Sequence, residues 1–586
     1  MTIQPRPEYP RPQLQRENWL NLNGEWEFEY DDCDAGKKEK WFQTGKAFSK
    51  KIQVPFAYQS KLSGIGDTSF HDVVWYKKQV VLPECFNGKR VIIHFGAVDY
   101  QADVWVNGQH AAYHQGGHTP FKADISDILI EGENSIVVRA EDFSTDITLP
   151  RGKQYWKEKP EVIWYTNTTG IWQTVWLESV SEKHIDEVRF TPHVDETEIE
   201  IQAFIKGYEI QDKLDLKVHI SFEGNVIAED LYKLKAKTEA RRIKLHEFSE
   251  HHLSHLWSPE TPFLYDVHLK LISEDKVIDE VKSYFGMRKV SIENGKFFLN
   301  NRPYSMKLVL DQGYFPDGIL TPPSEETIKN DIELTKAMGF NGARKHQKVE
   351  DPSYLYWCDR MGLIVWGEMA NALDFSESYA EKFAAEWQEV VKRDYNHPCI
   401  AVWVPLNESW GIPKVLTDVQ QQNHAMAMYY LTKSLDTTRL VVSNDGWEHV
   451  KTDLCSIHDY EWRKEILEDR YSTAERALHT LNTDFRYRKV YANGYCYSNE
   501  PIIISEFGGI AFKKSHQDGW GYSGAANEED FLNRIKAVVE PFKNSTVVCG
   551  FCYTQLTDVM QEINGLLTYD RTPKVSIEKI KQIISG

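Results

Sequence analysis

The pattern of hydrophobic and polar positions changes twice along the chain. In residues 1–180 short segments alternate apolar with polar side chains, as in Trp26, Phe28 and Tyr30, which are separated by glutamates. A period of two is typical of half-buried β-strands. Many such segments, with turn residues between them and no long helical pattern, predict a two-sheet jelly-roll β-sandwich.

A smaller region, residues 181–286, continues the alternation in segments such as 198–204, 216–222 and 265–272, which polar turns separate. Its length of about 100 residues and its number of strands predict an immunoglobulin-like β-sandwich.

In residues 287–586 short apolar runs alternate with long amphipathic segments, which is typical of a parallel sheet covered by helices. Eight candidate strands over roughly 300 residues predict a (β/α)8 TIM barrel. The candidate strands are 304–310, 341–345, 363–368, 400–406, 440–444, 455–458, 502–505 and 548–553, and the main candidate helices are 325–338, 352–361, 379–395, 419–435 and 528–542.

Two glutamates follow buried strands of this barrel. The apolar run 400–404 leads to Asn407-Glu408, and the run 502–505 leads to Glu506. Barrel enzymes place their chemistry at the C-terminal ends of the strands. Paired carboxylates there indicate glycoside cleavage, in which one acid protonates the departing oxygen and the other attacks the anomeric carbon.

The other strand ends supply groups that such a reaction needs. We predict that Glu408 is the acid/base and keeps its proton, while Arg344 and Tyr460 hold Glu506 as the ionised nucleophile. The amide of Asn407 is expected to bind a sugar 2-hydroxyl. The candidate substrate-binding residues are Asn407, Arg344, Tyr460, His458, Trp447, Trp410, Trp164 and Asn371.

One long segment of the first region, residues 142–165, interrupts the rhythm of strands and carries Trp156 and Trp164. Structureless segments of this length are usually functional or disordered, and this one is too aromatic for disorder. We expect the segment and Trp164 to close over the mouth of the barrel.

The composition narrows the class of partner. A net charge of −19 argues against nucleic acid and against an anionic membrane. The chain shows no apolar segment of the signal-peptide or membrane-spanning kind, so we expect a cytoplasmic protein. The eight cysteines are scattered, which favours reduced buried thiols. We predict no metal and no cofactor; the sequence leaves a homo-oligomer open.

Short motifs occur from one end of the chain to the other, at 22–26, 103–108, 169–177, 256–265, 285–288, 341–344, 357–363, 407–408 and 505–508. In this order they resemble glycoside hydrolase family 2, the family of β-galactosidases, β-glucuronidases and β-mannosidases. The resemblance covers essentially the whole chain. It implies that Glu408 is the acid/base and Glu506 the nucleophile, which agrees with the assignment from the strand ends.

The sequence also departs from that family's patterns. Arg344 is followed by Lys-His-Gln-Lys-Val rather than a Ser-His-Tyr-Pro-like run, and Trp164 stands where a sugar-contacting aspartate is frequent. The magnesium ligands of large β-galactosidases are not evident after Glu368. The Asn-x-Lys-Gly motif that binds a glucuronide carboxylate is also absent, and Glu562-Ile-Asn-Gly stands near the expected position.

We predict a retaining exo-β-glycosidase that acts on a small oligosaccharide or glycoside, with specificity like that of a β-galactosidase. A β-glucuronidase is the alternative within the family. A non-catalytic carbohydrate-binding protein is the alternative from another class.

Overall fold

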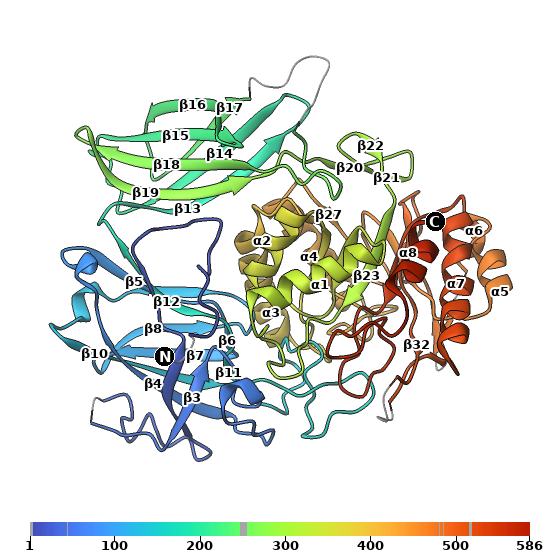
Figure 1. Ribbon diagram of the computed structural model, residues 1–586, viewed down its shortest axis with the longest axis horizontal. Coiled ribbons are helices and arrows are strands. Elements are labelled where there is room, and N and C mark those ends of the chain that lie inside the picture. The colour runs from blue at the N-terminus through green and yellow to red at the C-terminus, as the bar shows by residue number, and fades with distance from the viewer. Residues whose placement is uncertain (1–3, 44, 246–254, 480, 484–485, 515–518) are drawn as a thin grey trace.

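The computed structural model describes residues 4–43, 45–245, 255–479, 481–483, 486–514 and 519–586. Two β-sandwiches, blue to cyan and green, lie beside a barrel that is coloured yellow to red (Figure 1). The predicted jelly-roll sandwich, second sandwich and TIM barrel are therefore all present.

The first sandwich encloses its core between two antiparallel sheets. Trp26 and Phe28, which the alternation predicts to face inward, are both buried in this core. One sheet has the order β3 (Lys50–Val54), β2 (Gly24–Tyr30), β4 (Val73–Val81), β10 (Glu133–Glu141), β7 (Gln101–Val106), β8 (Gln109–Gln115). The other has the order β1 (Trp19–Asn21), β12 (Val175–Val180), β5 (Arg90–Phe95), β9 (Phe121–Asp124), and β6 (Val98–Asp99) pairs with β11 (Gly170–Ile171).

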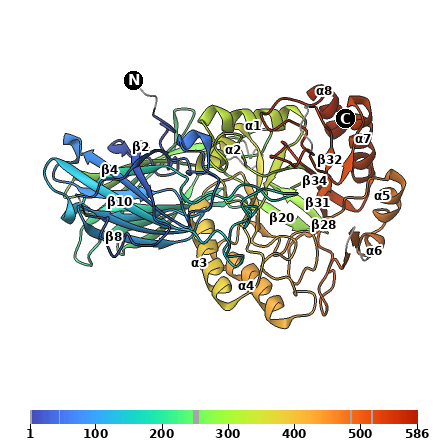
Figure 2. The same ribbon diagram turned by 90° about the horizontal axis from the view of Figure 1, so that it is seen from below.

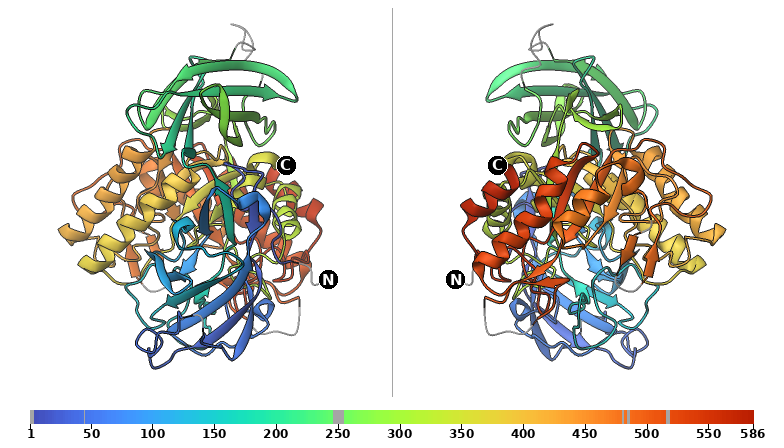
Figure 3. Two further views of the ribbon diagram at one scale, coloured as in Figure 1. Left: turned by 90° about the vertical axis from the view of Figure 1, so that its left-hand side faces the viewer. Right: turned by 90° about the vertical axis from the view of Figure 1, so that its right-hand side faces the viewer.

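The second sandwich has its own apolar core, and Figure 3 shows it at one end of the molecule from both sides. Along β14 every second side chain is buried, as the alternation predicts. Its sheets are β13 (His184–His193), β14 (Glu198–Lys206), β17 (Thr238–Lys244), and β16 (Asn225–Lys233), β15 (Leu214–Phe222), β18 (Tyr265–Ser273), β19 (Lys276–Phe285). A small sheet of β20 (Val290–Glu293), β21 (Lys296–Leu299) and β22 (Arg302–Pro303) leads into the barrel.

The barrel is a curled sheet of eight strands in which every paired neighbour is parallel. Its last strand, β34, pairs with the first, β23, and the described residues form no ladder between β27 and β28. In chain order the strands are β23 (Met306–Asp311), β24 (Gly342–Lys345), β25 (Ile364–Glu368), β26 (Ile400–Val404), β27 (Leu440–Val441), β28 (Cys455–His458), β31 (Ile502–Gly508) and β34 (Val548–Thr554).

The helices surround this sheet, with α1 and α8 on one side and α3 and α4 on the opposite side (Figure 2). Helix α1 begins as predicted, because the Ser324 side chain accepts a hydrogen bond from the amide of Thr327. The helices are α1 (Glu325–Ala337), α2 (Pro352–Met361), α3 (Glu377–Asp394), α4 (Val419–Leu435), α5 (Lys464–Arg470), α6 (Ala474–Ala477), α7 (Glu528–Asn544) and α8 (Ile577–Ser585). Short elements are η1 (Lys61–Ser63), η2 (Glu84–Phe86), η3 (Ser126–Ile128), β29 (Leu481–Thr483), β30 (Arg486–Arg488), β32 (Ile510–Ala511) and β33 (Ser523–Gly524).

Two barrel strands end three residues away from the predicted positions. β31 ends at Gly508 rather than at residue 505, and β27 ends at Val441 rather than at residue 444. After Val441 the chain leaves the ladder, but the Asp445 amide still donates a hydrogen bond to the Leu406 carbonyl oxygen at 2.8 Å. This bend carries Asn444 and Asp445 to the mouth of the barrel. No helix among the described residues is long and apolar enough to cross a membrane.

Candidate active site

The two predicted catalytic glutamates lie at the same end of the barrel, after β26 and within β31. Glu408 and Ser409 both adopt left-handed backbone conformations, with φ of 52° and 61°. Such conformations cost on the order of 1–3 kcal/mol each in non-glycine residues and persist where neighbours hold them. Here the Asp445 carbonyl oxygen accepts from the Glu408 amide, and the Asn444 side chain accepts from the Ser409 amide, both at 2.9 Å.

The two carboxylates are close together, and His458 contacts both. One oxygen of Glu408 and one of Glu506 lie within 4.8 Å of each other. The Nδ1 of His458 is 2.9 Å from Glu408, and its Nε2 is 3.5 Å from Glu506. The tertiary structure thus brings together two acids that the sequence places on different strands.

Arg344 is the central cation beneath this pair, and its side chain is 0% exposed. It donates to Glu506 at 2.8 Å, to the side-chain oxygen of Asn407 at 2.7 Å and to Glu368 at 2.8 Å. Asp445 lies 3.0 Å from its Nε. These contacts show that Arg344 positions the acidic side chains and the Asn407 amide, and that its buried guanidinium does not contact the sugar directly.

The pKa of Glu506 is lowered, because the positive charges of His458 and Arg344 outweigh the opposing effect of burial. Tyr460 donates a hydrogen bond to the second oxygen of Glu506 at 2.6 Å. Its ring stacks on Tyr522 at 3.4 Å, which fixes its direction. The predicted partners of Glu506 are therefore where the sequence reasoning places them, and they hold it as a carboxylate.

The proton of Glu408 is not where we predicted it. Burial raises the pKa of Glu408, but the hydrogen bond and charge of His458 outweigh burial and lower it. Burial would lower the pKa of His458, yet Glu506, Asp445 and Glu408 together raise it to about 10. The substrate-free site thus holds its proton on His458, because three carboxylates surround that imidazole.

The amide nitrogen of Asn407 is buried and has no hydrogen-bond partner among the described residues. This nitrogen is thus a hydrogen-bond donor available at the barrel mouth, as a residue that binds a sugar hydroxyl requires. Asn371 lies beneath it, fully buried, and its side-chain oxygen accepts from the Asn407 backbone amide at 2.8 Å. Since its own amide nitrogen donates to the Pro405 carbonyl oxygen at 2.9 Å, Asn371 supports Asn407 and has no free group for substrate.

Aromatic side chains wall the site. Trp164 of the first sandwich stacks on Trp410 of the barrel, with ring centroids 4.7 Å apart. Trp447 lies 5.4 Å from the His458 ring, and its indole nitrogen is buried without a partner among the described residues. The segment 142–165 therefore reaches the barrel mouth, as expected from its length and aromatic content.

Hydrogen bonds to two different barrel loops fasten this segment. The amide of Gly152 donates to the carbonyl oxygen of Asn371 at 3.0 Å, after β25. The side chain of Gln561, after β34, donates to the carbonyl oxygen of Trp164 at 2.9 Å. The first sandwich is therefore part of the site and not a separate appendage.

The three parts of the chain match three family models. Residues 20–179 match "Glycosyl hydrolases family 2, sugar binding domain", residues 183–288 match "Glycosyl hydrolases family 2", and residues 290–586 match "Glycosyl hydrolases family 2, TIM barrel domain". The chain belongs to glycoside hydrolase family 2. It is accordingly a glycoside hydrolase of the β-glycosidase kind.

Relatives of this family 2 enzyme differ in name. A β-galactosidase of Thermoanaerobacter pseudethanolicus is 30% identical over 67% of the chain, which spans 52% of that protein. A β-glucuronidase of Canis lupus familiaris is 26% identical over 97% of the chain and 90% of that protein. The solved β-glucuronidase of an uncultured Clostridium sp. has a TM-score of 0.77 at 21% identity, covering 98% of this chain and 99% of its own.

Several residues of the family 2 site were not selected from the sequence. Asp445 follows a predicted strand and Glu368 is the last residue of another, so the rule that identified Glu408 could also have identified them. Lys153 gave no signal, because a single lysine in a long loop is normally exposed. Lys345, although next to Arg344, points elsewhere and pairs with Asp311 and Glu350.

Two groups of described residues have donor atoms close enough for a metal ion. One is the catalytic pair with His458, whose hydrogen bond to Glu408 and ion pair with Glu506 already account for its geometry. The other is Asp359, His397 and Cys399, buried and hydrogen-bonded to one another. Both sets are explained without an ion, and the absence of a metal stays a prediction.

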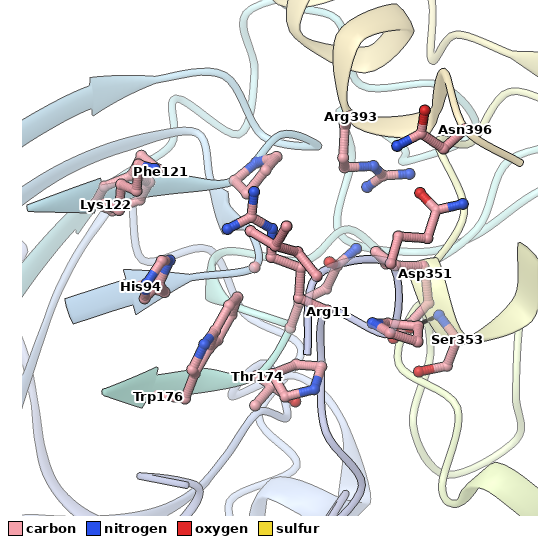
Figure 4. Close-up of a pocket in the computed structure, with 18 of the residues that line it drawn as sticks. Arg11, His94, Phe121, Lys122, Thr174, Trp176, Asp351, Ser353, Arg393 and Asn396 are labelled. Atoms are coloured by element: carbon pink, nitrogen blue, oxygen red, sulfur yellow. Dashed lines mark hydrogen bonds between the residues drawn. The ribbon is translucent and has the colours of Figure 1, made fainter. Parts of the chain in front are cut away.

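A separate cavity of about 290 Å³ lies between the first sandwich and the barrel. Figure 4 shows Arg11 near its centre, with His94 and Trp176 on one side and Asp351 and Ser353 on the other. None of the predicted site residues lines it.

Proposed function

We propose that this enzyme is a retaining exo-β-glycosidase that cleaves terminal β-linked sugars by double displacement. The spacing of Glu408 and Glu506 carries the proposal, since their nearest oxygens lie within 4.8 Å. Retaining enzymes hold their carboxyl groups about 5–5.5 Å apart, whereas inverting enzymes leave about 6.5–9.5 Å for a water molecule.

In the first step a Glu506 oxygen forms a bond to the anomeric carbon while the bond to the leaving oxygen breaks and Glu408 protonates that oxygen. In the second step Glu408 removes a proton from water, the water oxygen bonds to the anomeric carbon, and Glu506 leaves. Arg344 and Tyr460 stabilise the departing carboxylate, and the free amide of Asn407 is placed for the 2-hydroxyl.

The proton for the first step comes from the pair formed by His458 and Glu408. Their 2.9 Å contact joins an imidazolium to a carboxylate in the substrate-free site. A sugar that covers the mouth removes water from both groups, and loss of water disfavours charged forms. The uncharged arrangement, with the proton on Glu408, then becomes the better one.

β-Galactosides are the first candidate substrates, in line with the 30% identical relative named β-galactosidase. β-Glucuronides are the second, because relatives named β-glucuronidase match nearly the whole chain, 97% in the case of the Canis lupus familiaris protein. The walled mouth formed by Trp164 and Trp410 supports attack on a terminal sugar.

A panel of nitrophenyl β-glycosides tests the proposal, and turnover of none of them would refute it. The variants separate the roles. With an activated 2-deoxy-2-fluoro glycoside, Glu408→Gln should still form a glycosyl-enzyme that mass spectrometry detects, and Glu506→Gln should form none. Glu381→Gln, an exposed position on α3, is the matched control and should behave as wild type.

A further inference from the structure

Lys153 is a buried cation that the first sandwich inserts beside the active site. The residue is 5% exposed, although it belongs to the long segment 142–165 that connects two strands of the first sandwich. Its ammonium lies 4.9 Å from the ring centroid of Trp410 and 5.9 Å from that of Trp164. It therefore lies at the aromatic wall, against Trp410, which follows the acid Glu408 by two residues in the chain.

The N–H groups of the Lys153 ammonium have no hydrogen-bond acceptor among the described residues. The Lys153 carbonyl oxygen accepts from the Tyr165 amide, but the ammonium forms no hydrogen bond or ion pair with any described residue and contacts the two tryptophan rings. A lysine ammonium carries three N–H donors, and a buried charge is strongly disfavoured unless oxygen acceptors surround it. The two rings supply a cation–π attraction but accept no conventional hydrogen bond.

Glu562, which follows β34 at the barrel mouth, does not act as a hydrogen-bond acceptor for the Lys153 ammonium. Its oxygens accept hydrogen bonds from Tyr165 and from Asn564. Lys153 is nevertheless within electrostatic reach of it: burial raises the pKa of Glu562, and the charge of Lys153 is the largest opposing influence. Lys153 also helps to lower the pKa of Glu408, after burial and His458. The ammonium is thus within electrostatic range of both Glu408 and Glu562.

We propose that Lys153 is a specificity-determining residue that donates hydrogen bonds to an oxygen of the terminal sugar, a hydroxyl of a neutral sugar or the carboxylate of a uronic acid. The inference rests on the proposed function. It gives the first sandwich a direct share in choosing the substrate, because a sugar in the site would supply the oxygen acceptors that the ammonium does not find among the described side chains.

The segment is held firmly enough for this role. The amide of Gly152, the preceding residue, donates to the Asn371 carbonyl oxygen, and Tyr155 and Tyr165 are bridged through their backbones at 2.9 Å. A donor on a fixed backbone loses less freedom on binding than a surface lysine does. Lys159 in the same segment is exposed and provides a matched control.

The test compares kcat/KM for nitrophenyl β-galactoside and β-glucuronide in wild type, Lys153→Met, Lys153→Arg and Lys159→Met. Lys153→Met should lower kcat/KM for the better substrate roughly 10- to 100-fold, the effect of losing a charged hydrogen bond. Lys153→Arg should recover part of it, and Lys159→Met should stay within about twofold.

The pattern across substrates identifies the acceptor. A loss confined to the glucuronide shows that Lys153 binds a carboxylate, and a loss of similar size on both substrates shows that it binds a hydroxyl. If Lys153→Met matches Lys159→Met on every glycoside that wild type cleaves, the inference is wrong. If wild type cleaves neither substrate nor any other glycoside, the proposed function itself fails. Unchanged melting temperatures exclude a folding effect.

Discussion

Replacement of His458 by glutamine should change the pH range in which the enzyme works. His458 lies 3.5 Å from Glu506 and 2.9 Å from Glu408, and its raised pKa of about 10 keeps it positively charged at neutral pH. Glutamine is uncharged but retains hydrogen-bonding groups. The variant His458→Gln therefore removes one of the two cations that lower the pKa of Glu506, and leaves Arg344 in place.

The size of the effect follows from the distance. Unit charges 3.5 Å apart attract by about 1.2 kcal/mol in water and by about 4.7 kcal/mol at an effective dielectric constant of about 20. Since about 1.4 kcal/mol corresponds to one pH unit, and neighbouring charges typically shift a carboxyl by about 1–3 units, we expect a shift of that size. The direction is upward, because loss of a cation makes the Glu506 carboxylate harder to form.

The assay is kcat/KM as a function of pH with a dinitrophenyl glycoside, whose leaving group does not need protonation. Activity requires ionised Glu506 and is lost as the pH falls through its pKa. The acidic limb of His458→Gln should therefore lie about 1–3 pH units above that of wild type. His449→Gln is the control, because this buried histidine contacts the Ser456 carbonyl oxygen and forms no ion pair with any carboxylate that the structure describes. An acidic limb that stays in place in His458→Gln would contradict the electrostatic account.

Three further predictions concern groups that position the site. Tyr460→Phe removes the 2.6 Å hydrogen bond to Glu506, and glycosylation measured by pre-steady-state kinetics should slow by roughly 10- to 100-fold; an unchanged rate would show that the bond is not used. Asn371→Ala releases the backbone of Asn407 and should lower kcat by about tenfold with a smaller change in KM, whereas an effect on KM alone would indicate direct substrate contact. Gly152→Ala should lower kcat/KM more than its control Gly132→Ala. Both glycines have a positive φ, but only at position 152 would the new methyl group meet a barrel carbonyl oxygen, at 2.1 Å. Equal losses in the two variants would refute a role for this close approach.

The alternation of apolar and polar residues was enough to predict the classes of fold. A strand packed on one face must alternate, as β14 does, and a strand buried on both faces must be continuously apolar, as Ile400–Val404 is. Local rules also located Glu408 and Glu506, because strands of a parallel barrel end on one face whatever their spacing in the chain.

Local rules could not assign protonation states. We expected the proton on Glu408 because two acids at this distance cannot both be ionised without compensation. The structure supplies that compensation through His458, which contacts both acids and Asp445. A pKa depends on the sum of charges and on burial in three dimensions, and residues separated by many strands contribute to it.

The sequence by itself thus determined the three folding units and the positions of the two acids, which depend on local periodicity and on strand ends, and its short motifs indicated the family by resemblance. Only the tertiary structure decided which groups tune the acids, that Asn371 supports Asn407 rather than the sugar, and that Lys153 crosses from the first sandwich to the barrel mouth. Such pairings join residues far apart in the chain, and packing between elements fixes them, not the pattern within any one element.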